Sequence, residues 1–419
     1  MLIRMLLSGS LFFSLKGTAQ DFSYTDRIYS PTVKSVTFHP LGMGIAAAVS
    51  DVEGNTPLLL TFDDLTYDAR RFVYRIIHCD FDWEPSELME MEYVQGYTED
   101  DIRQFAYSSK TTRSYVHYEL TLPNANTRWT RSGNYLLVVF EDEDRRIPVI
   151  TRRFVVVDNQ VQIDPSWSIP AQASGYRTHQ ELDFMVRHPR LNIRQPMQEI
   201  RATVVQNGQW ANALVGMVPF QFGNQYISFD HQGKIVFAGG NEFRQLDLRS
   251  LWQRTGQMAD LVRSKTSTEV VLFRDRLRGE EPYFQNRDIN GRFFLETRDQ
   301  GNPLASDYAQ VLFTLDAPEP FLDKEVYLLG AFNDWLALPE YKMIHSEADK
   351  GYILKKPLKQ GFYNYAFGMT TSRESRPDLR ETEGSFYETE NEYLVFIYYR
   401  PFGARADEVI GYLQVQSGR

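Results

Sequence analysis

The sequence predicts an all-β protein built from tandem immunoglobulin-like β-sandwiches, and three observations support this fold class. Short segments of alternating apolar and polar residues recur along the chain, as at 58–63 and 116–122. Turn residues separate these segments at the spacing typical of sandwiches. No stretch longer than a couple of turns has the periodicity of an amphipathic helix. With 419 residues, the chain is long enough for two or three such domains.

The N-terminal segment has the features of a secretory signal peptide. Arg4 supplies the positive charge, and Met5 to Leu15 form a short apolar stretch, which is shorter than the roughly 20 residues needed to span a bilayer. Gly17-Thr18-Ala19 predicts cleavage after Ala19, which makes residues 1–19 the signal peptide. No Cys follows the cleavage site, so a lipid anchor is not indicated. We therefore expect an exported protein that is soluble after cleavage.

Composition excludes several classes of function. A net charge of −10 argues against nucleic-acid binding, which needs a basic surface. Cys79 is the only cysteine, so the chain has no disulfide framework, and its position after a strand favours a small buried residue over a nucleophile. Aromatic residues make up 14% of the sequence. This surplus predicts that some Tyr and Phe are exposed at an interface.

Residues 20–158 form the predicted first sandwich. Its characteristic stretch is Phe72 to Tyr97, a strand that runs into the loop HCDFDW and a short acidic segment. This stretch is read either as a core strand with a crossover or as a loop that presents Trp83 and its acidic neighbours. Tyr135 to Phe140 is apolar on both faces and is therefore predicted in the interior of a sheet. Ile147 to Val157 is its expected hairpin partner.

Two further sandwiches are predicted over residues 159–302 and 303–419. In the second, Asn207-Gly208 is a strong hairpin turn, and a short helix is expected within Ser250 to Ser264. In the third, Val326 to Trp335 reads VYLLGAFNDW, and Tyr393 to Pro401 is a strand that is apolar on both faces.

The sequence contains no complete metal-binding or catalytic motif of a known kind. Asp80, Asp82 and Glu84 have the spacing of a calcium loop, but Pro85 and Met91 stand where that loop needs Gly and Glu. The His residues form no zinc motif, and there is no nucleophile elbow or phosphate-binding loop. A glycosidase carboxylate pair stays open, although nothing selects one pair. The acidic runs Glu99–Asp101 and Glu141–Asp144 are predicted to be solvated loop tips, or surfaces that orient a partner.

Several segments in order closely resemble the plug proteins of the type IX secretion system, a family of Bacteroidota long carried as a domain of unknown function. The resemblance covers about residues 28 to 413 and is carried by LTFDDL, YRIIHCDFDWEPSEL, EYVQGYTEDDI, YVHYELTLPN, SGNYLLVV, RRFVVV, VYLLGAFNDW, KQGFYNYAF and EGSFYETENEYLVFIYYRPFGARADEVIGY. It implies a non-enzymatic periplasmic protein that docks on a large outer-membrane β-barrel translocon. Such a plug closes the barrel's periplasmic opening when no substrate is in transit.

The stretch VYLLGAFNDW is also similar to early-set immunoglobulin-like domains, including glycogen-binding modules. This similarity implies an early-set fold for the third sandwich and gives the alternative function, a periplasmic glycan-binding protein. Trp335 is the last Trp of the chain, so the second Trp of the usual sugar platform has no counterpart. A glycoside hydrolase or its accessory protein is the third alternative. Gly330 and Asn333 are expected to be required for the turn, whatever ligand the domain binds.

Under the plug hypothesis, the candidate partner-binding residues are Trp83, Glu84, Tyr97 and Trp335. The expected partner is the translocon barrel, reached from the periplasm without insertion into the membrane. No enzymatic activity, cofactor, metal, nucleic acid or small-molecule substrate is expected.

Overall fold

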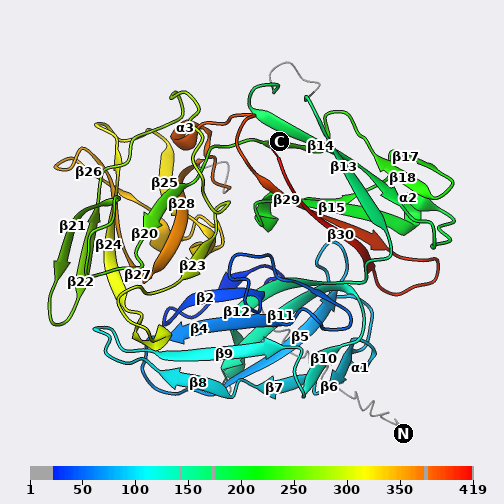
Figure 1. The fold of residues 1–419 in the computed structure, drawn as a ribbon, viewed down its shortest axis with the longest axis horizontal. Coiled ribbons are helices and arrows are strands. Elements are labelled where there is room, and N and C mark those ends of the chain that lie inside the picture. Colours follow the sequence, from blue (N-terminus) through cyan, green and yellow to red (C-terminus); the bar gives the residue numbers. More distant parts are fainter. Residues whose placement is uncertain (1–21, 142–143, 171–174, 372–375, 418–419) are drawn as a thin grey trace, which may run out of the picture.

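The computed structural model describes residues 22–141, 144–170, 175–371 and 376–417, and it contains three β-sandwiches. The predicted signal peptide and its cleavage site therefore lie outside the described residues. Figure 1 shows the sandwiches as three lobes arranged around a common junction. The prediction of an all-β protein with sandwich domains is confirmed.

The first sandwich consists of two sheets that face each other. One has the strand order β1-β12-β11-β5-β7, with β3 parallel to β12, and the other has the order β2-β4-β9-β8. A small sheet, β10-β6, and the helix α1 lie beside them. Their bounds are β1 Arg27–Ile28, β2 Val33–Pro40, β3 Val49–Asp51, β4 Leu58–Asp64, β5 Phe72–Cys79, α1 Glu90–Tyr93, β6 Val94–Gly96, β7 Glu99–Asp101, β8 Gln104–Tyr107, β9 Val116–Leu122, β10 Thr127–Trp129, β11 Gly133–Glu141 and β12 Asp144–Val157.

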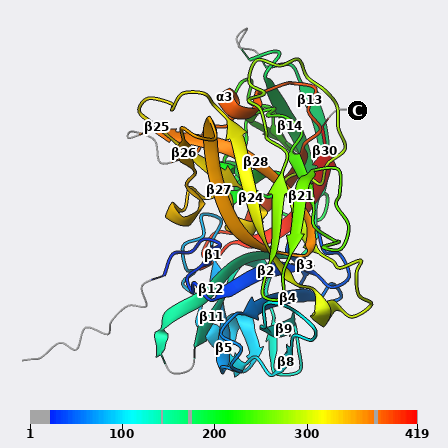
Figure 2. The same cartoon turned by 90° about the vertical axis from the view of Figure 1, so that its left-hand side faces the viewer.

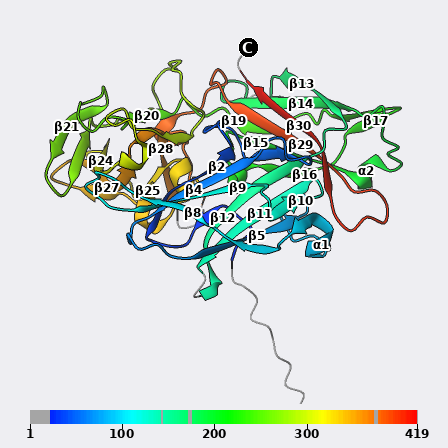
Figure 3. The same ribbon diagram turned by 60° about the horizontal axis from the view of Figure 1, so that its bottom comes forward.

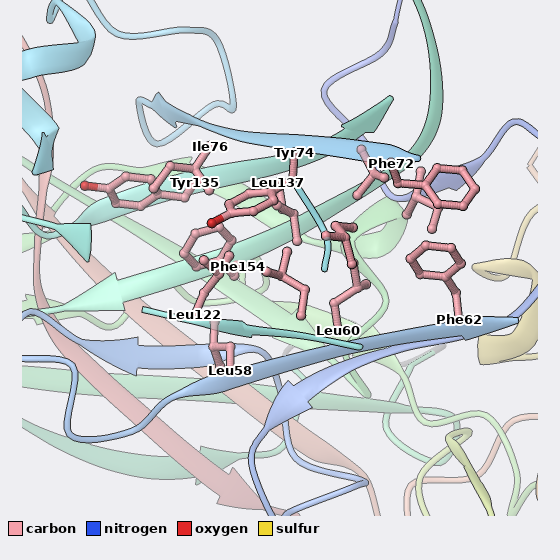
Figure 4. Close-up of a cluster of buried hydrophobic side chains, with 14 of the residues drawn as sticks. Leu58, Leu60, Phe62, Phe72, Tyr74, Ile76, Leu122, Tyr135, Leu137 and Phe154 are labelled. Carbon is pink, nitrogen blue, oxygen red and sulfur yellow. The ribbon is translucent and has the colours of Figure 1, made fainter. Parts of the chain in front are cut away.

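The core of the first sandwich follows from the alternation of apolar residues. Leu58, Leu60 and Phe62 of β4 are fully buried and face apolar side chains of β5 and β11 (Figure 4). Burying each such side chain contributes about 1.5–3 kcal/mol. The alternation read at 58–63 and 116–122 therefore predicted this core.

The second sandwich has sheets in the orders β13-β14-β18-β17, with β19 on β14, and β16-β15-β29-β30. The turn Asn207-Gly208 has positive φ at both residues and leads from β15 through η1 to its partner β16, as predicted. The elements are β13 Gln162–Ser168, β14 His179–Arg187, α2 Pro196–Glu199, β15 Ile200–Gln206, η1 Trp210–Asn212, β16 Leu214–Met217, β17 Gln221–Gly223, β18 Tyr226–Phe229, β19 Val236–Ala238, β29 Glu392–Tyr399 and β30 Glu408–Gln416.

The third sandwich has sheets in the orders β20-β28-β23, with β25 on β28, and β21-β22-β24-β27-β26. Figure 2 shows it standing above the first sandwich. Its elements are β20 Arg244–Asp247, β21 Met258–Arg263, β22 Thr268–Leu272, β23 Phe293–Leu295, η2 Pro303–Ala305, β24 Tyr308–Asp316, β25 Lys324–Leu329, η3 Ala331–Asn333, η4 Pro339–Tyr341, β26 Ile344–Ser346, β27 Gly351–Lys359, β28 Gly361–Thr371 and α3 Arg380–Glu383.

The strand pairing departs from the predicted division at residues 302 and 303. The third sandwich begins at β20 and is inserted into the second, whose sheet is completed by the C-terminal strands β29 and β30. The helix expected within Ser250 to Ser264 is not there, and β21 occupies its second half. Local patterns could not predict either outcome, because a strand's partner is fixed by packing across the whole fold.

Strands β11 and β29 are apolar on both faces because each face packs against a different partner. Tyr135, Leu137 and Val139 of β11 point into the core of the first sandwich. Leu136, Val138 and Phe140 point the other way, onto Leu394, Phe396 and Tyr398 of β29. The first and second sandwiches thus share a separate apolar core between them.

Candidate functional site

The region singled out by sequence starts at β5 and ends at Tyr97, and its first turn leads into the core between the first and second sandwiches. Trp83 has φ of +68°, which is uncommon for a residue with a side chain, and is only 3% exposed. Its ring makes an edge contact with Trp210 at 4.9 Å between centroids. The Arg153 guanidinium lies 4.5 Å from the centre of the same ring. Trp83 therefore joins two sandwiches and offers no surface to a partner in this arrangement.

The acidic residues after β5 hold the C-terminal hairpin loop, which connects β29 to β30. Asp80 accepts a hydrogen bond from the backbone N–H of Asp407 at 3.0 Å and forms an ion pair with Arg400 at 2.5 Å. Asp407 in turn accepts from the backbone N–H of Phe81 at 2.9 Å. Among the described residues, no group of His, Cys, Asp or Glu is arranged to hold a metal ion. Asp80 thus braces two distant segments, while Asp82 accepts a local hydrogen bond from the backbone N–H of Glu84 at 3.2 Å.

The other predicted partner residues lie apart from Trp83. Glu84 is exposed beside it on the outer side of the turn, and Tyr97 is 61% exposed in the connection between β6 and β7. Trp335 is half-buried and packs on Phe243 at 5.1 Å between ring centroids, in the third sandwich. The structure therefore does not bring Trp83, Glu84, Tyr97 and Trp335 into one site.

The turn that carries Trp335 has the geometry expected from its motif. The side chain of Asn333 accepts from the backbone N–H of Gly330 at 2.9 Å and donates to the carbonyl of Leu328 at 2.9 Å. A Cβ on Gly330 would lie 2.2 Å from the ring of Phe332, so a larger residue would require that ring to move. Asp334 and Trp335 both have positive φ. This turn points toward the junction of the three sandwiches.

Several hollows lie where the described parts of the sandwiches meet, and two of them bear on the predicted sites. One, of about 300 Å³, is lined by Trp335 and Trp210 together with Arg152 and Asp334, whose side chains are 3.3 Å apart. The other, of about 900 Å³, is a cleft between the first and third sandwiches and includes Phe105 in its lining. Trp335 thus lies in a junction and does not provide an open platform for a sugar ring.

Sequence reasoning missed a buried polar cluster between the first and third sandwiches. Asp63 of β4 is fully buried and forms an ion pair with Lys359 of β27 at 2.6 Å. It also accepts hydrogen bonds from the Tyr308 hydroxyl and from Nδ1 of His117, each at 2.7 Å. Burial raises the pKa of Asp63, but Lys359 and His117 outweigh it and hold the pKa below its usual value. The cluster fixes the two sandwiches to each other.

The acidic runs differ from the prediction of solvated tips. Glu99–Asp101 is strand β7 and pairs with β5, and Asp100 is buried beside Arg103 and Asn126. Glu141 forms an ion pair with Arg70 at 2.7 Å, and the centre of its run lies outside the described residues. Strand pairing at β7 overrides the low β-propensity of the acidic residues.

Cys79 is expected to be unreactive in the folded protein. It is fully buried, and burial raises the pKa of its thiol, so the reactive thiolate is scarce. Native protein treated with iodoacetamide at pH 8 should stay unlabelled, and protein in concentrated urea should take up one label. Rapid labelling without urea would contradict the buried position and would require the two sandwiches to separate easily.

The fold and these contacts define a class: three β-sandwiches joined into one body, with polar braces where they meet. Residues 33–158 match the family model described as type 9 secretion system plug protein 1st domain, so the first sandwich belongs to the type IX secretion plug family. The resemblance seen in the sequence is thereby confirmed over residues 33–158. This family is one of secretion components and is not a known class of enzyme.

Comparison with solved structures gives a likeness over nearly the whole chain. A crystal structure of a hypothetical protein from Parabacteroides merdae ATCC 43184 is 29% identical and has a TM-score of 0.89. The match covers 94% of this chain and all of that one. None of the curated proteins compared matches the chain. In the part of the chain that the structure describes, no helix is long and apolar enough to cross a membrane.

Proposed function

We propose that this protein is a non-enzymatic periplasmic plug. It docks on the outer-membrane barrel translocon of the type IX secretion system and closes the periplasmic opening when no substrate is in transit. The observation that carries this proposal is the plug-family match of the first sandwich. The predicted signal peptide supports the periplasmic location.

The joined body suits a steric function. A plug must keep its shape while it blocks an opening, so its domains must not move freely. Here an apolar core joins the first sandwich to the second, and the Asp63–Lys359 pair joins the first to the third. Arg292 of the third sandwich forms an ion pair with Glu392 of the second. Each pair of sandwiches is therefore fixed by buried contacts.

Deletion of the gene tests the proposal. Because a plug contributes nothing to the transport step, secretion should continue in the deletion strain while the outer membrane becomes permeable. The measurement is sensitivity to large antibiotics that normally do not cross this membrane, alongside the amount of secreted cargo. A plasmid copy of the gene should restore the barrier. Unchanged permeability with loss of secretion would make the protein a working part of the transporter.

A further inference from the structure

Three exposed apolar side chains lie on two neighbouring segments, the start of α1 and the β29–β30 loop. Met89 is 65% exposed, Met91 is 81% exposed and Phe402 is 98% exposed. Figures 1 and 3 show the loop beside α1, although more than 300 residues separate them in the sequence. We call Met89, Met91 and Phe402 the apolar tip.

The apolar tip is held by contacts between its two segments. Arg405 of the loop forms an ion pair with Glu92 of α1 and donates to the carbonyl of Glu87 at 3.4 Å. At the base of the loop, Arg400 and Asp407 contact Asp80 as described above. Because these backbones are already ordered, a partner that covers the tip loses little conformational entropy. Methionine side chains can also adjust to an irregular pocket.

The charge around the tip selects the kind of partner. The segment 80–92 contains six carboxylates and no Lys or Arg. Three arginines also lie here, but each is paired with a carboxylate: Arg400 with Asp80, Arg405 with Glu92, and Arg131 with Glu408. Glu84, Glu87 and Glu90 are exposed, and their carboxylates have no ion pair among the described contacts, so the unpaired charge of this rim is acidic. An anionic lipid surface would repel such a rim, because membrane-binding patches combine apolar residues with Lys and Arg. A protein surface with basic residues around an apolar pocket would be complementary.

We propose that the apolar tip, with its rim of Glu84, Glu87 and Glu90, is the surface through which this protein docks on a protein partner. The matching site on that partner is an apolar pocket edged by Lys or Arg. The inference rests on the proposed function, which makes the translocon barrel the partner. It assigns the docking contact to the end of the body formed by the first and second sandwiches.

The test uses full-length protein and the translocon barrel purified in mild detergent from the deletion strain. The triple variant M89S/M91S/F402S should bind the barrel at least about tenfold more weakly than the unchanged protein, because a few anchors dominate such interfaces. The matched control is F284S/L322S/I344S, whose three residues are exposed to a similar degree, at 79%, 85% and 71%, but lie in the third sandwich. This control should bind as the unchanged protein does.

A second variant tests the rim. E84K/E87K/E90K should also bind at least about tenfold more weakly, and the affinity of the unchanged protein should fall as salt is raised. Vesicles of phosphatidylglycerol and phosphatidylethanolamine form the lipid arm, and no binding to them is expected. Melting curves of all variants should match, since the changed residues are exposed.

The outcomes separate the two proposals. If the unchanged protein does not bind the barrel, the proposed function and the docking surface both fail. If it binds and the tip variant binds equally well, or the control weakens as much as the tip variant, only the docking surface is wrong. Binding to vesicles that is lost in the tip variant would overturn the protein partner in favour of a lipid surface.

Discussion

The variant Lys359→Met is expected to lower the free energy of unfolding by about 3–5 kcal/mol. The reason is the environment of its partner. Asp63 is fully buried between the first and third sandwiches and would keep hydrogen bonds from Tyr308 and His117 but lose its strongest cation. A buried carboxylate without that charge retains most of its desolvation cost. Urea unfolding followed by intrinsic fluorescence measures the loss.

The same strand provides the control. Lys355, also in β27, forms an ion pair with Glu269 at 2.8 Å, and both side chains are nearly half exposed. Because exposed pairs contribute little, Lys355→Met should change the stability by less than about 1 kcal/mol. The double variant Asp63→Asn/Lys359→Met should lose less than the sum of its single variants, since neither charge is then left alone. Equal losses for Lys359→Met and Lys355→Met would refute the role of the buried pair.

The contribution of Asp63 also depends on pH. Because the folded protein holds the pKa of Asp63 below the unfolded value of about 4, its stabilising effect is fully present above that pH. It is lost as the pH falls from about 4 through the folded pKa. The difference in stability between the unchanged protein and Asp63→Asn should therefore shrink in this acidic range.

The sequence predicted the strands better than their partners. Alternation at Leu58, Leu60 and Phe62 is a local property, and it correctly placed these residues in a core. The both-face apolar pattern of Tyr393 to Pro401 correctly indicated burial on two sides. However, the pattern could not indicate that one side meets the first sandwich and the other completes the second. Without that information, the insertion of the third sandwich into the second could not be predicted from the sequence.

The polar cluster between sandwiches was hidden for the same reason. Asp63 alternates with apolar residues on β4, so the sequence pattern predicts that its side chain faces solvent. Its cation, Lys359, is 296 positions away in the sequence. The neighbouring Asp64 gave no signal for the cluster, because it lies on the same face of β4 as Phe62 and pairs with Arg70, whereas Asp63 lies on the opposite face and is buried by the third sandwich. Pairing across such a separation depends on the docking of whole domains, which a single sequence does not reveal.

Replacing Trp83 by Ala is expected to lower the free energy of unfolding by about 3–5 kcal/mol, the usual loss when a buried Trp is truncated. The change would remove the ring that fills the space between Trp210 and Arg153, where the first and second sandwiches meet. An exposed docking anchor, which the sequence suggested for Trp83, would give the opposite result. That variant would melt normally and fail only to bind the partner.

Two companions make the experiment decisive. Trp83→Phe should lose about half as much stability or less, because a ring stays in place and the indole N–H, which is buried with no hydrogen-bond partner among the described residues, is removed. Trp252→Ala, at a residue that is 55% exposed, should change the stability by less than about 0.5 kcal/mol. Urea unfolding and binding to the purified barrel are measured for all three variants. A Trp83→Ala protein of unchanged stability that no longer binds would mean that the two sandwiches separate to expose this ring, and that docking uses the surface now buried between them.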